Sequence, residues 1–247
     1  MSEDITLEAY ATKQELIDNL DEIFEETVRD MLTTQDSVHV VLTGGTVGIA
    51  LLENIDPNNK LDWSKIHLWW GDERFVPEGH PDRNEGQATA ALIHRLPIPA
   101  ENVHRMPASD AGLSLDEAVD AYDAELAQFW PEQPEFDITF LGVGPDAHIA
   151  SLFPGLEGIS VDNCAVIAVE DSPKPPAQRI SLTLPAINAS KNVWVVASGA
   201  DKADAIYAAF TASDKRVAPV SAVEGTEETV FFTDEDAARR LIEDDQA

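Results

Sequence analysis

Hydrophobic and polar positions alternate with two different periods along this chain. Residues 12–32 carry an apolar side chain every three or four positions, with acidic residues between them, and this spacing predicts an amphipathic helix. Residues 37–42 form a β-branched apolar run, which predicts a strand. After two glycines, residues 45–55 predict a second, more apolar helix. This part of the chain is therefore expected to form a unit of strand, loop and helix.

The same alternation continues toward the C-terminus. The further predicted strands are residues 65–70, 136–142, 192–198 and 229–233, and the further predicted helices are residues 84–96, 114–130, 199–210 and 234–242. The strand runs are apolar on both faces, which is typical of buried parallel strands. Strands that alternate with helices in this way predict an α/β fold with an open, mostly parallel sheet.

Length and composition limit what the chain can be. Its 247 residues, 44% of them hydrophobic, can bury the core of one large domain, and we predict a single domain over residues 1–247. The acidic start does not resemble a signal peptide, and no run stays apolar for the about 18 residues of a membrane span. Cys164 is the only cysteine, so no intrachain disulfide or cysteine metal cluster can form. We expect a soluble, cytoplasmic protein.

The charge is strongly unbalanced, with 16 Lys and Arg against 46 Asp and Glu and a net charge of −30. Such a surface repels polyanions, so we expect neither a nucleic-acid nor a membrane partner. We interpret the acidity as a solubility or salt-tolerance trait. Because an anionic ligand would have to bind against this field, each basic residue in a candidate ligand loop is informative.

Loops that follow the strands are the candidate ligand sites, because parallel α/β sheets bind ligands beyond the carboxyl ends of their strands. Gly44, Gly45 and Thr46 lie between a predicted strand and a predicted helix. Glycines let the backbone approach a ligand, and the free N–H groups of a helix N-terminus suit a phosphate. A tight turn that needs glycine is an equally good interpretation. No Gly-Lys-Ser/Thr follows, so a nucleotide P-loop is not supported.

Three basic residues lie at other strand or helix ends. Arg74 follows a strand and two acidic residues, and an arginine can hold a phosphate or carboxylate through two parallel hydrogen bonds. Arg179 begins a strand after the proline-rich connector 171–178. Lys202 lies at a helix start, the unfavourable end for a cation, which suggests an anionic ligand. For Arg74 and Lys202 the alternative interpretation is a solvated surface charge.

Residues 141–155, "LGVGPDAHIASLFPG", contain the candidate base. His148 follows a strand in a glycine-containing loop, two residues after Asp146. It is either a general base with a nearby carboxylate or a hydrogen-bonded structural histidine. The loop also fits a permissive dinucleotide-binding pattern. However, its prolines leave little room for the required helix, and no acidic residue ends the next strand within about 20 residues. We therefore disfavour an NAD-linked dehydrogenase.

Taken together and in chain order, these motifs resemble the 6-phosphogluconolactonase family, relatives of the glucosamine-6-phosphate isomerases. The resemblance spans roughly residues 39 to 210 and rests on "TGGT", "WGDERFVP", "DRNEGQA", the His148 loop, "RISLTLPAINAS" and "GADKADAI". It implies a Rossmann-like topology with helices on both faces of the sheet. It also implies a hydrolase of the oxidative pentose phosphate pathway, which converts 6-phospho-D-glucono-1,5-lactone to 6-phosphogluconate without a metal or organic cofactor.

The resemblance implies roles for individual residues as well. His148 would be the catalytic base and Asp146 its companion. The 6-phosphate and the lactone would be held by Gly44, Gly45, Thr46, Arg74, Arg179 and Lys202. Neutral His148 would take a proton from the water that attacks C1 and return it to the ring oxygen. Arg74 or backbone N–H groups would stabilise the oxyanion. No Gly-x-Ser-x-Gly elbow is present, which disfavours an acyl-enzyme.

Two positions depart from the family pattern. Ala147 replaces the usual glycine before the histidine, and we predict that it has a negative φ. Arg83 stands where the family often has serine, and we expect it at the rim of the site without an assigned role. The expected partner is one small phosphorylated sugar lactone, and the chain is expected to be a monomer or a small homo-oligomer.

Two other functions stay open. A sugar-phosphate isomerase or deaminase of the same superfamily would continue the histidine loop into Phe-Asn-Glu-Pro, where this chain has Ser151 to Pro154. The glutamate of that pattern is missing here. The other alternative is a non-catalytic sugar-phosphate sensor, which only a turnover measurement excludes.

Overall fold

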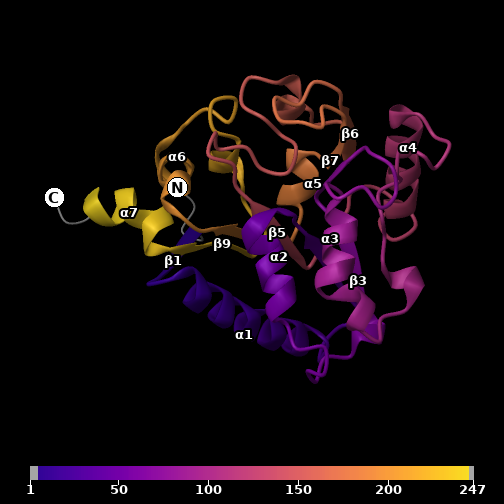
Figure 1. The fold of residues 1–247 in the computed structure, drawn as a ribbon, viewed down its shortest axis with the longest axis horizontal. Helices are drawn as coiled ribbons and strands as arrows, with labels where there is room; N and C mark the ends of the chain where they lie inside the picture. The colour runs from indigo at the N-terminus through magenta and orange to yellow at the C-terminus, as the bar shows by residue number, and fades with distance from the viewer. Residues whose placement is uncertain (1–4, 245–247) are drawn as a thin grey trace.

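Six parallel strands form the main sheet of the protein, which we describe for residues 5–244 of a computed structural model (Figure 1). In their order across the sheet, the strands are β1 (Ile5–Tyr10), β9 (Glu228–Asp234), β8 (Asn192–Ala197), β5 (Ile138–Gly142), β2 (Val38–Leu42) and β3 (Ile66–Trp70). Every neighbouring pair is parallel. The predicted α/β fold with a mostly parallel sheet is confirmed.

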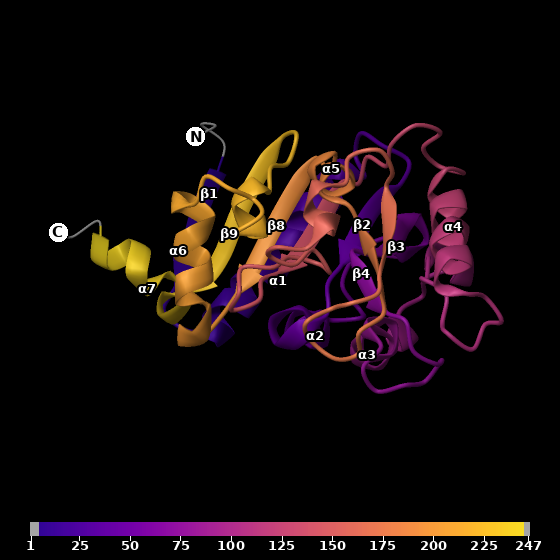
Figure 2. The same cartoon turned by 90° about the horizontal axis from the view of Figure 1, so that it is seen from above.

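Seven α-helices occur in the described part of the chain. They are α1 (Lys13–Met31), α2 (Gly45–Asn54), α3 (Asn84–Ala91), α4 (Leu115–Leu126), α5 (Leu184–Asn188), α6 (Ala203–Thr211) and α7 (Glu235–Asp244). In Figure 1, α1 lies below the main sheet and α6 above it, and Figure 2 shows α4 beyond the edge strand β3. No helix among residues 5–244 is both long and apolar enough to span a membrane.

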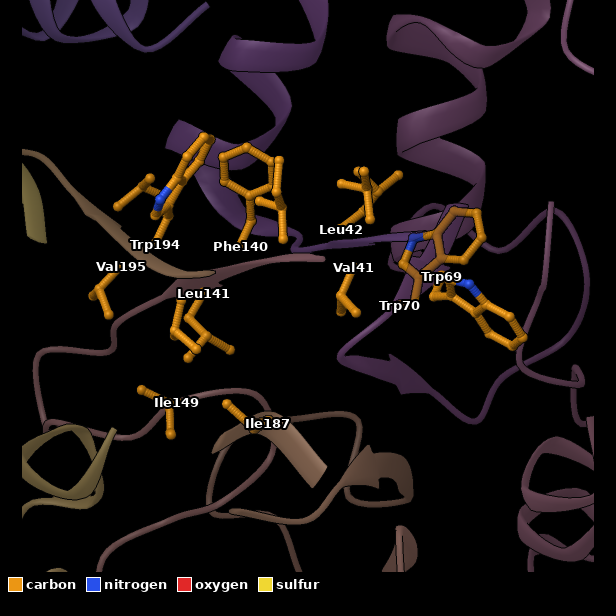
Figure 3. Packing of buried hydrophobic residues seen from close by; sticks show 14 of the residues in the cluster. Val41, Leu42, Trp69, Trp70, Phe140, Leu141, Ile149, Ile187, Trp194 and Val195 are labelled. Carbon is orange, nitrogen blue, oxygen red and sulfur yellow. The ribbon is translucent and has the colours of Figure 1, made fainter. Parts of the chain in front are cut away.

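The central strands are apolar on both faces, as predicted for buried parallel strands. Phe140 and Trp194 point to one face of the sheet, and the next residue in each strand, Leu141 and Val195, points to the other (Figure 3). Ile187 of α5 lies on the second side. All five side chains are buried. Both faces of the sheet therefore need a covering layer, which helices such as α1 provide on one side and α5 and α6 with neighbouring loops provide on the other.

Helix α1 agrees with its prediction almost to the residue. Its apolar stripe, which includes Leu16 and Leu20, is buried, and the side chain of Thr12 caps the helix by accepting a hydrogen bond from Glu15 N at 3.2 Å. The predicted helix at 84–96 is shorter, since α3 ends at Ala91 and a 3₁₀ turn follows. A 3₁₀ turn also precedes α6, so the predicted helix 199–210 begins later than expected.

A second, three-stranded sheet was not predicted. It is antiparallel and consists of β4 (Asp72–Arg74), β7 (Arg179–Leu182) and β6 (Val166–Val169), in that order. Strand β4 continues from β3 after Gly71, and Leu182 N donates to Gly71 O at 2.8 Å, so the two sheets are joined there. In this register Arg74 is the pairing partner of Arg179. The small sheet thereby places two basic residues at the carboxyl end of β3.

Candidate active site

The segments that follow β2, β3, β5 and β8 meet at the carboxyl edge of the main sheet and line a cavity of about 230 Å³. The predicted site residues on its wall are Gly44, Gly45, Arg74, His148, Arg179 and Lys202. Thr46 lines two adjoining cavities of about 540 and 330 Å³, which share Gly45 with the first. Residues separated by more than 150 positions in the sequence are thus brought to one side of the sheet.

His148 and Asp146 contact each other directly. His148 Nδ1 lies 2.5 Å from Asp146 Oδ1, and the imidazole packs on the ring of Phe153 with a centroid distance of 4.6 Å. Because an ionised carboxylate can only accept hydrogen bonds, Nδ1 carries the proton in this pair. The neutral ring then has its lone pair on Nε2, which is the arrangement that a general base needs.

The charge states of this pair follow from their surroundings. Burial lowers the pKa of His148, and the hydrogen bond and charge of Asp146 offset that effect only in part. Burial raises the pKa of Asp146, but its bonds to His148 and Lys174 and their charges outweigh burial and bring the pKa to about 2. At neutral pH the pair therefore consists of a neutral imidazole and an ionised carboxylate.

The loop around His148 corrects the prediction for Ala147. That residue has a φ of +66°, and Ala150 has a φ of +46°, so the expected negative φ is wrong. The tight turn requires it, because Ala147 N donates to Gly144 O and Gly144 N donates to His148 O, both at 2.9 Å. A left-handed conformation costs an L-residue about 1–2 kcal/mol. This chain accepts that strain beside the candidate base.

Gly144 is sterically required in the same loop. A Cβ at this position would overlap the imidazole of His148 and approach the carboxylate of Asp146. Gly44 has an equivalent reason, since a Cβ there would overlap the side-chain amide of Asn84. Gly45 has a φ of +81°, so the tight-turn interpretation of this loop is correct at that residue.

Arg74 is fixed on the cavity wall by two acceptors. Its Nη1 donates to Asp82 O at 2.9 Å and to Asn84 Oδ1 at 2.5 Å. Asn84 is held in turn, because its Nδ2 donates to Asp72 O at 2.8 Å and its N to Glu73 Oε1 at 2.8 Å. The Nε of Arg74 is buried and has no hydrogen-bond partner within the described residues. Such a donor is costly to bury unless a ligand accepts from it.

The side chains of Arg179 and Lys202 differ in how far other protein groups already occupy them. The buried guanidinium of Arg179 donates from Nε to Pro176 O at 2.9 Å and from Nη2 to Lys174 O at 3.0 Å, so two of its nitrogens hold the preceding connector. Its Nη1 lies 3.9 Å from Asp72 Oδ2. Lys202 lies beside the cavity with its Nζ 3.5 Å from the exposed carboxylate of Asp201.

Arg83 does not lie at the rim, contrary to expectation. Its side chain is 2% exposed, Nη2 donates to Met106 O at 2.8 Å, and the guanidinium lies 3.8 Å from Glu73 and 3.4 Å from Glu85. Glu73 in turn accepts from the backbone N–H groups that begin α3. Arg83 therefore compensates a buried carboxylate that anchors this helix and does not enter the cavity.

Sequence reasoning missed several residues of the site. Lys174 Nζ lies 3.0 Å from Asp146 Oδ1, and Ser151 Oγ donates to Asp72 Oδ2 at 2.7 Å. The sequence contained a signal for Lys174, because it is a single lysine in a proline-rich connector of a very acidic chain. Ser151 and Asn84 gave no signal that distinguishes them from ordinary polar residues. Across residues 5–244, no three His, Cys, Asp or Glu side chains gather in a way that could bind a metal ion.

Comparison with known proteins identifies relatives from one family. Residues 11–232 match the family described as glucosamine-6-phosphate isomerases/6-phosphogluconolactonase. The 6-phosphogluconolactonase of Streptomyces coelicolor is 45% identical over 86% of this chain and 85% of its own. That of Mycobacterium tuberculosis is 46% identical over 82% of this chain and 84% of its own.

Solved structures have the same architecture. The 6-phosphogluconolactonase of Thermotoga maritima superposes with a TM-score of 0.81 at 29% identity, over 94% of this chain and 99% of that one. A monomeric glucosamine-6-phosphate deaminase superposes with a TM-score of 0.77 at 18% identity, over 95% and 99%, and at that identity the likeness concerns the fold alone. From the matched length and these identities, the chain belongs to the glucosamine-6-phosphate isomerase/6-phosphogluconolactonase family.

Proposed function

We propose that the chain hydrolyses 6-phospho-D-glucono-1,5-lactone to 6-phospho-D-gluconate, with His148 as the general base. The observation that carries this proposal is the 2.5 Å contact between His148 Nδ1 and Asp146 Oδ1 at a cavity lined with basic residues. The substrate class is supported by the names of the relatives at 45% and 46% identity, which are 6-phosphogluconolactonases. A cytoplasmic location is part of the proposal, since the free thiol of Cys164 suits a reducing compartment.

The reaction needs one base that later acts as an acid. His148 Nε2 removes a proton from water as the water oxygen forms a bond to C1 of the lactone. The tetrahedral intermediate then collapses, the bond between C1 and the ring oxygen breaks, and the imidazolium returns the proton to that oxygen. Asp146 keeps the ring in the required tautomer and stabilises the imidazolium between the two steps. The carboxylic acid that forms at C1 loses its proton to solvent.

The developing oxyanion at C1 needs a fixed donor. Arg74 fits this role because its guanidinium is already positioned by Asp82 and Asn84, and because its Nε is buried without a partner in the described residues. A donor that is oriented before the reaction stabilises the transition state without reorganising first. We therefore propose that Arg74 faces the C1 oxygen.

The 6-phosphate is proposed to bind at the N-terminus of α2. The backbone of Gly44, Gly45 and Thr46 begins this helix, and Lys202 lines the same cavity of about 330 Å³. A helix N-terminus and a cation together suit a dianionic phosphate. Arg179 adds positive charge on the wall of the adjoining cavity, although two of its nitrogens hold the connector.

The test is a hydrolysis assay in which the lactone is generated in place and the spontaneous rate is subtracted. We expect the wild type to accelerate hydrolysis. In His148→Ala the enzymatic rate should fall by about 10²–10⁴-fold, the usual contribution of a positioned base. His94→Ala is the matched control, because His94 is exposed and its ring contacts Thr89 O within its own segment.

Three results would overturn the proposal. If His148→Ala retains nearly full turnover, His148 is not the base. If the folded wild type leaves the lactone rate unchanged but releases ammonia from glucosamine 6-phosphate, the chain is a deaminase. A folded wild type that binds sugar phosphates without any turnover would be a sensor.

A further inference from the structure

Lys174 reaches the candidate base from a distant segment of the chain. It belongs to the connector between β6 and β7, and its Nζ lies 3.0 Å from Asp146 Oδ1 and 3.1 Å from His148 Nδ1. Asp146 Oδ1 and His148 Nδ1 are themselves 2.5 Å apart. The ammonium, the carboxylate and the imidazole therefore form a closed triangle.

The protons in this triangle can be assigned. An ammonium only donates, and an ionised carboxylate only accepts. Nδ1 donates its proton to Asp146 and has no lone pair left for Lys174. The ammonium therefore donates to Asp146 Oδ1 and faces Nδ1 only as a positive charge. Asp146 accepts two hydrogen bonds at one oxygen, which fixes both the carboxylate and the tautomer of the ring.

We propose that Lys174 is a positioning residue for the base, which locks Asp146 against the Nδ1–H side of His148 and keeps the imidazole neutral, with Nε2 free, before substrate binds. This inference rests on the proposed function, because it assigns Lys174 a role in the same hydrolysis. Lys174 acts through Asp146 and His148 and needs no contact with the lactone.

The connector is built to hold this lysine in place. Lys174 N donates to Ser172 Oγ at 3.3 Å, and Ser172 Oγ donates to Lys174 O at 2.9 Å. Arg179 Nη2 donates to the same carbonyl at 3.0 Å. Three hydrogen bonds at one residue restrict the backbone from which the side chain extends. The hydrogen bond from Arg179 Nη2 thereby helps to hold Lys174 beside Asp146.

The charges around the His148 ring determine in which direction its pKa changes when Lys174 is replaced. The charged groups that face or surround His148 are Asp146 in its own loop, Lys174 in the connector, Asp72 in β4 and, around the cavity, Arg74, Arg179 and Lys202. Burial lowers the pKa of His148 most, both carboxylates raise it, and Lys174 lowers it. Removing the ammonium must therefore raise the pKa of His148, so that more of the ring is protonated at a given pH.

The experiment compares Lys174→Met, which keeps the length of the side chain, with Lys174→Arg, which keeps the charge. Two quantities are measured: the pH dependence of kcat/KM, and the titration of the His148 ring by NMR in the substrate-free enzyme. In Lys174→Met we expect the acidic limb of kcat/KM and the NMR midpoint to move to higher pH together. The plateau should fall about tenfold, less than the about 10²-fold minimum expected for loss of the base itself.

Two further variants distinguish a positioning role of Lys174 from a general effect of replacing a lysine. Lys174→Arg should return the limb and the midpoint to their wild-type positions. Lys65→Met is the matched control. Lys65 is exposed and directly precedes β3, at the amino end of the strand and away from the site at the carboxyl ends, so both quantities should stay unchanged. Lys174 is 43% exposed, so Lys174→Met should fold, which its circular dichroism spectrum checks.

Three outcomes decide the matter. An unmoved NMR midpoint in Lys174→Met overturns the inference. A higher KM with an unchanged acidic limb also overturns it, because Lys174 would then bind substrate. If the wild type does not hydrolyse the lactone while the midpoint still moves, the proposed function fails and the coupling of Lys174 to His148 stands. The two failures are therefore distinguishable.

Discussion

At the scale of single residues, the site depends on short contacts around one imidazole. Asp146 fixes the tautomer of His148, and Gly144 leaves the space that both side chains occupy. Ala147 turns the chain through a left-handed conformation between them. Because the loop has so little free volume, a small steric change should be seen first in catalysis.

Gly144→Ala tests this dependence. The new Cβ would overlap the His148 ring and must displace it, and a displacement of about 1 Å can cost about 10²-fold in rate. We therefore expect kcat/KM for the lactone to fall by about 10²-fold. Gly86→Ala in helix α3 is the control, because its Cβ would lie 4.0 Å from Arg83 Cβ, an ordinary contact distance. An alanine inside a helix should stabilise the protein by about 0.5–1 kcal/mol relative to glycine. Wild-type kcat/KM in Gly144→Ala would contradict this account.

Only part of the site was predictable from the sequence. His148 and Asp146 were found because they share one loop after a strand, so their proximity follows from local sequence. Lys174 and Asn84 come from other segments, and only the folded chain brings them to these partners. The φ of Ala147 was predicted wrongly, because steric preference favours negative φ for alanine and the turn hydrogen bonds override that preference.

At the scale of elements, the sequence predicted five strands of the main sheet but not β1, and of the small sheet it predicted only the strand that begins at Arg179. The parallel strands are apolar runs of five to seven residues, apart from β1 at the sheet edge, where three of the six residues are exposed and three are half-buried. Strands β4, β6 and β7 have three or four residues, and β4 consists of charged ones. Such short runs carry no detectable period, and their pairing is decided by tertiary contacts.

A histidine cluster near the β3 edge of the main sheet is a second feature of this scale. His39 of β2 stacks on His67 of β3 with a centroid distance of 4.5 Å, and His67 Nδ1 lies 2.9 Å from His104 Nε2. Trp69 Nε1 donates to His39 Nδ1 at 3.1 Å. Burial, with a further contribution from neighbouring His67, lowers the pKa of His39 to about 3, and burial also lowers the pKa of His67.

This cluster should make stability depend on pH. A histidine has a pKa of about 6.5 when unfolded, so the unfolded chain binds more protons than the folded one below that pH. The contribution of His39 to stability is therefore complete above about pH 6.5 and is lost as the pH falls toward about 3. His39→Gln should have a lower Tm than wild type at about pH 7.5, and the difference should shrink by about pH 5. Melting curves of both proteins check this, with the exposed His94→Gln as control, and parallel Tm profiles would refute it.

At the scale of the whole molecule, charge is the dominant feature. The net charge is −30, yet Arg74, Lys174, Arg179 and Lys202 line one cavity of about 230 Å³. One continuous hydrophobic cluster includes residues of both sheets, such as Val195 and Ile180, which supports our proposal of a single domain. The acidic surface therefore surrounds a single core and a locally basic site.

Self-repulsion of this surface should be measurable as a dependence of Tm on salt. Raising the NaCl concentration from about 0.1 M to about 1 M shortens the Debye length from about 10 Å to about 3 Å and screens like charges on the surface. We expect the Tm to rise over this range and the lactonase activity to persist. A steady fall of both with added salt would rule out the salt-tolerance interpretation of the acidity.

The basic cavity within an acidic shell also bears on how a turnover ends. Under the proposed reaction, the lactone enters with only its phosphate charged, and the product leaves with an additional carboxylate. The cations at the carboxyl edge of the sheet attract both molecules, whereas the surrounding negative field repels the product more strongly, because it carries the greater charge. Outside the cavity, the surface acidity therefore opposes rebinding of the product more strongly than it opposes the approach of the lactone, an effect on the rates of binding and not on the equilibrium of the reaction.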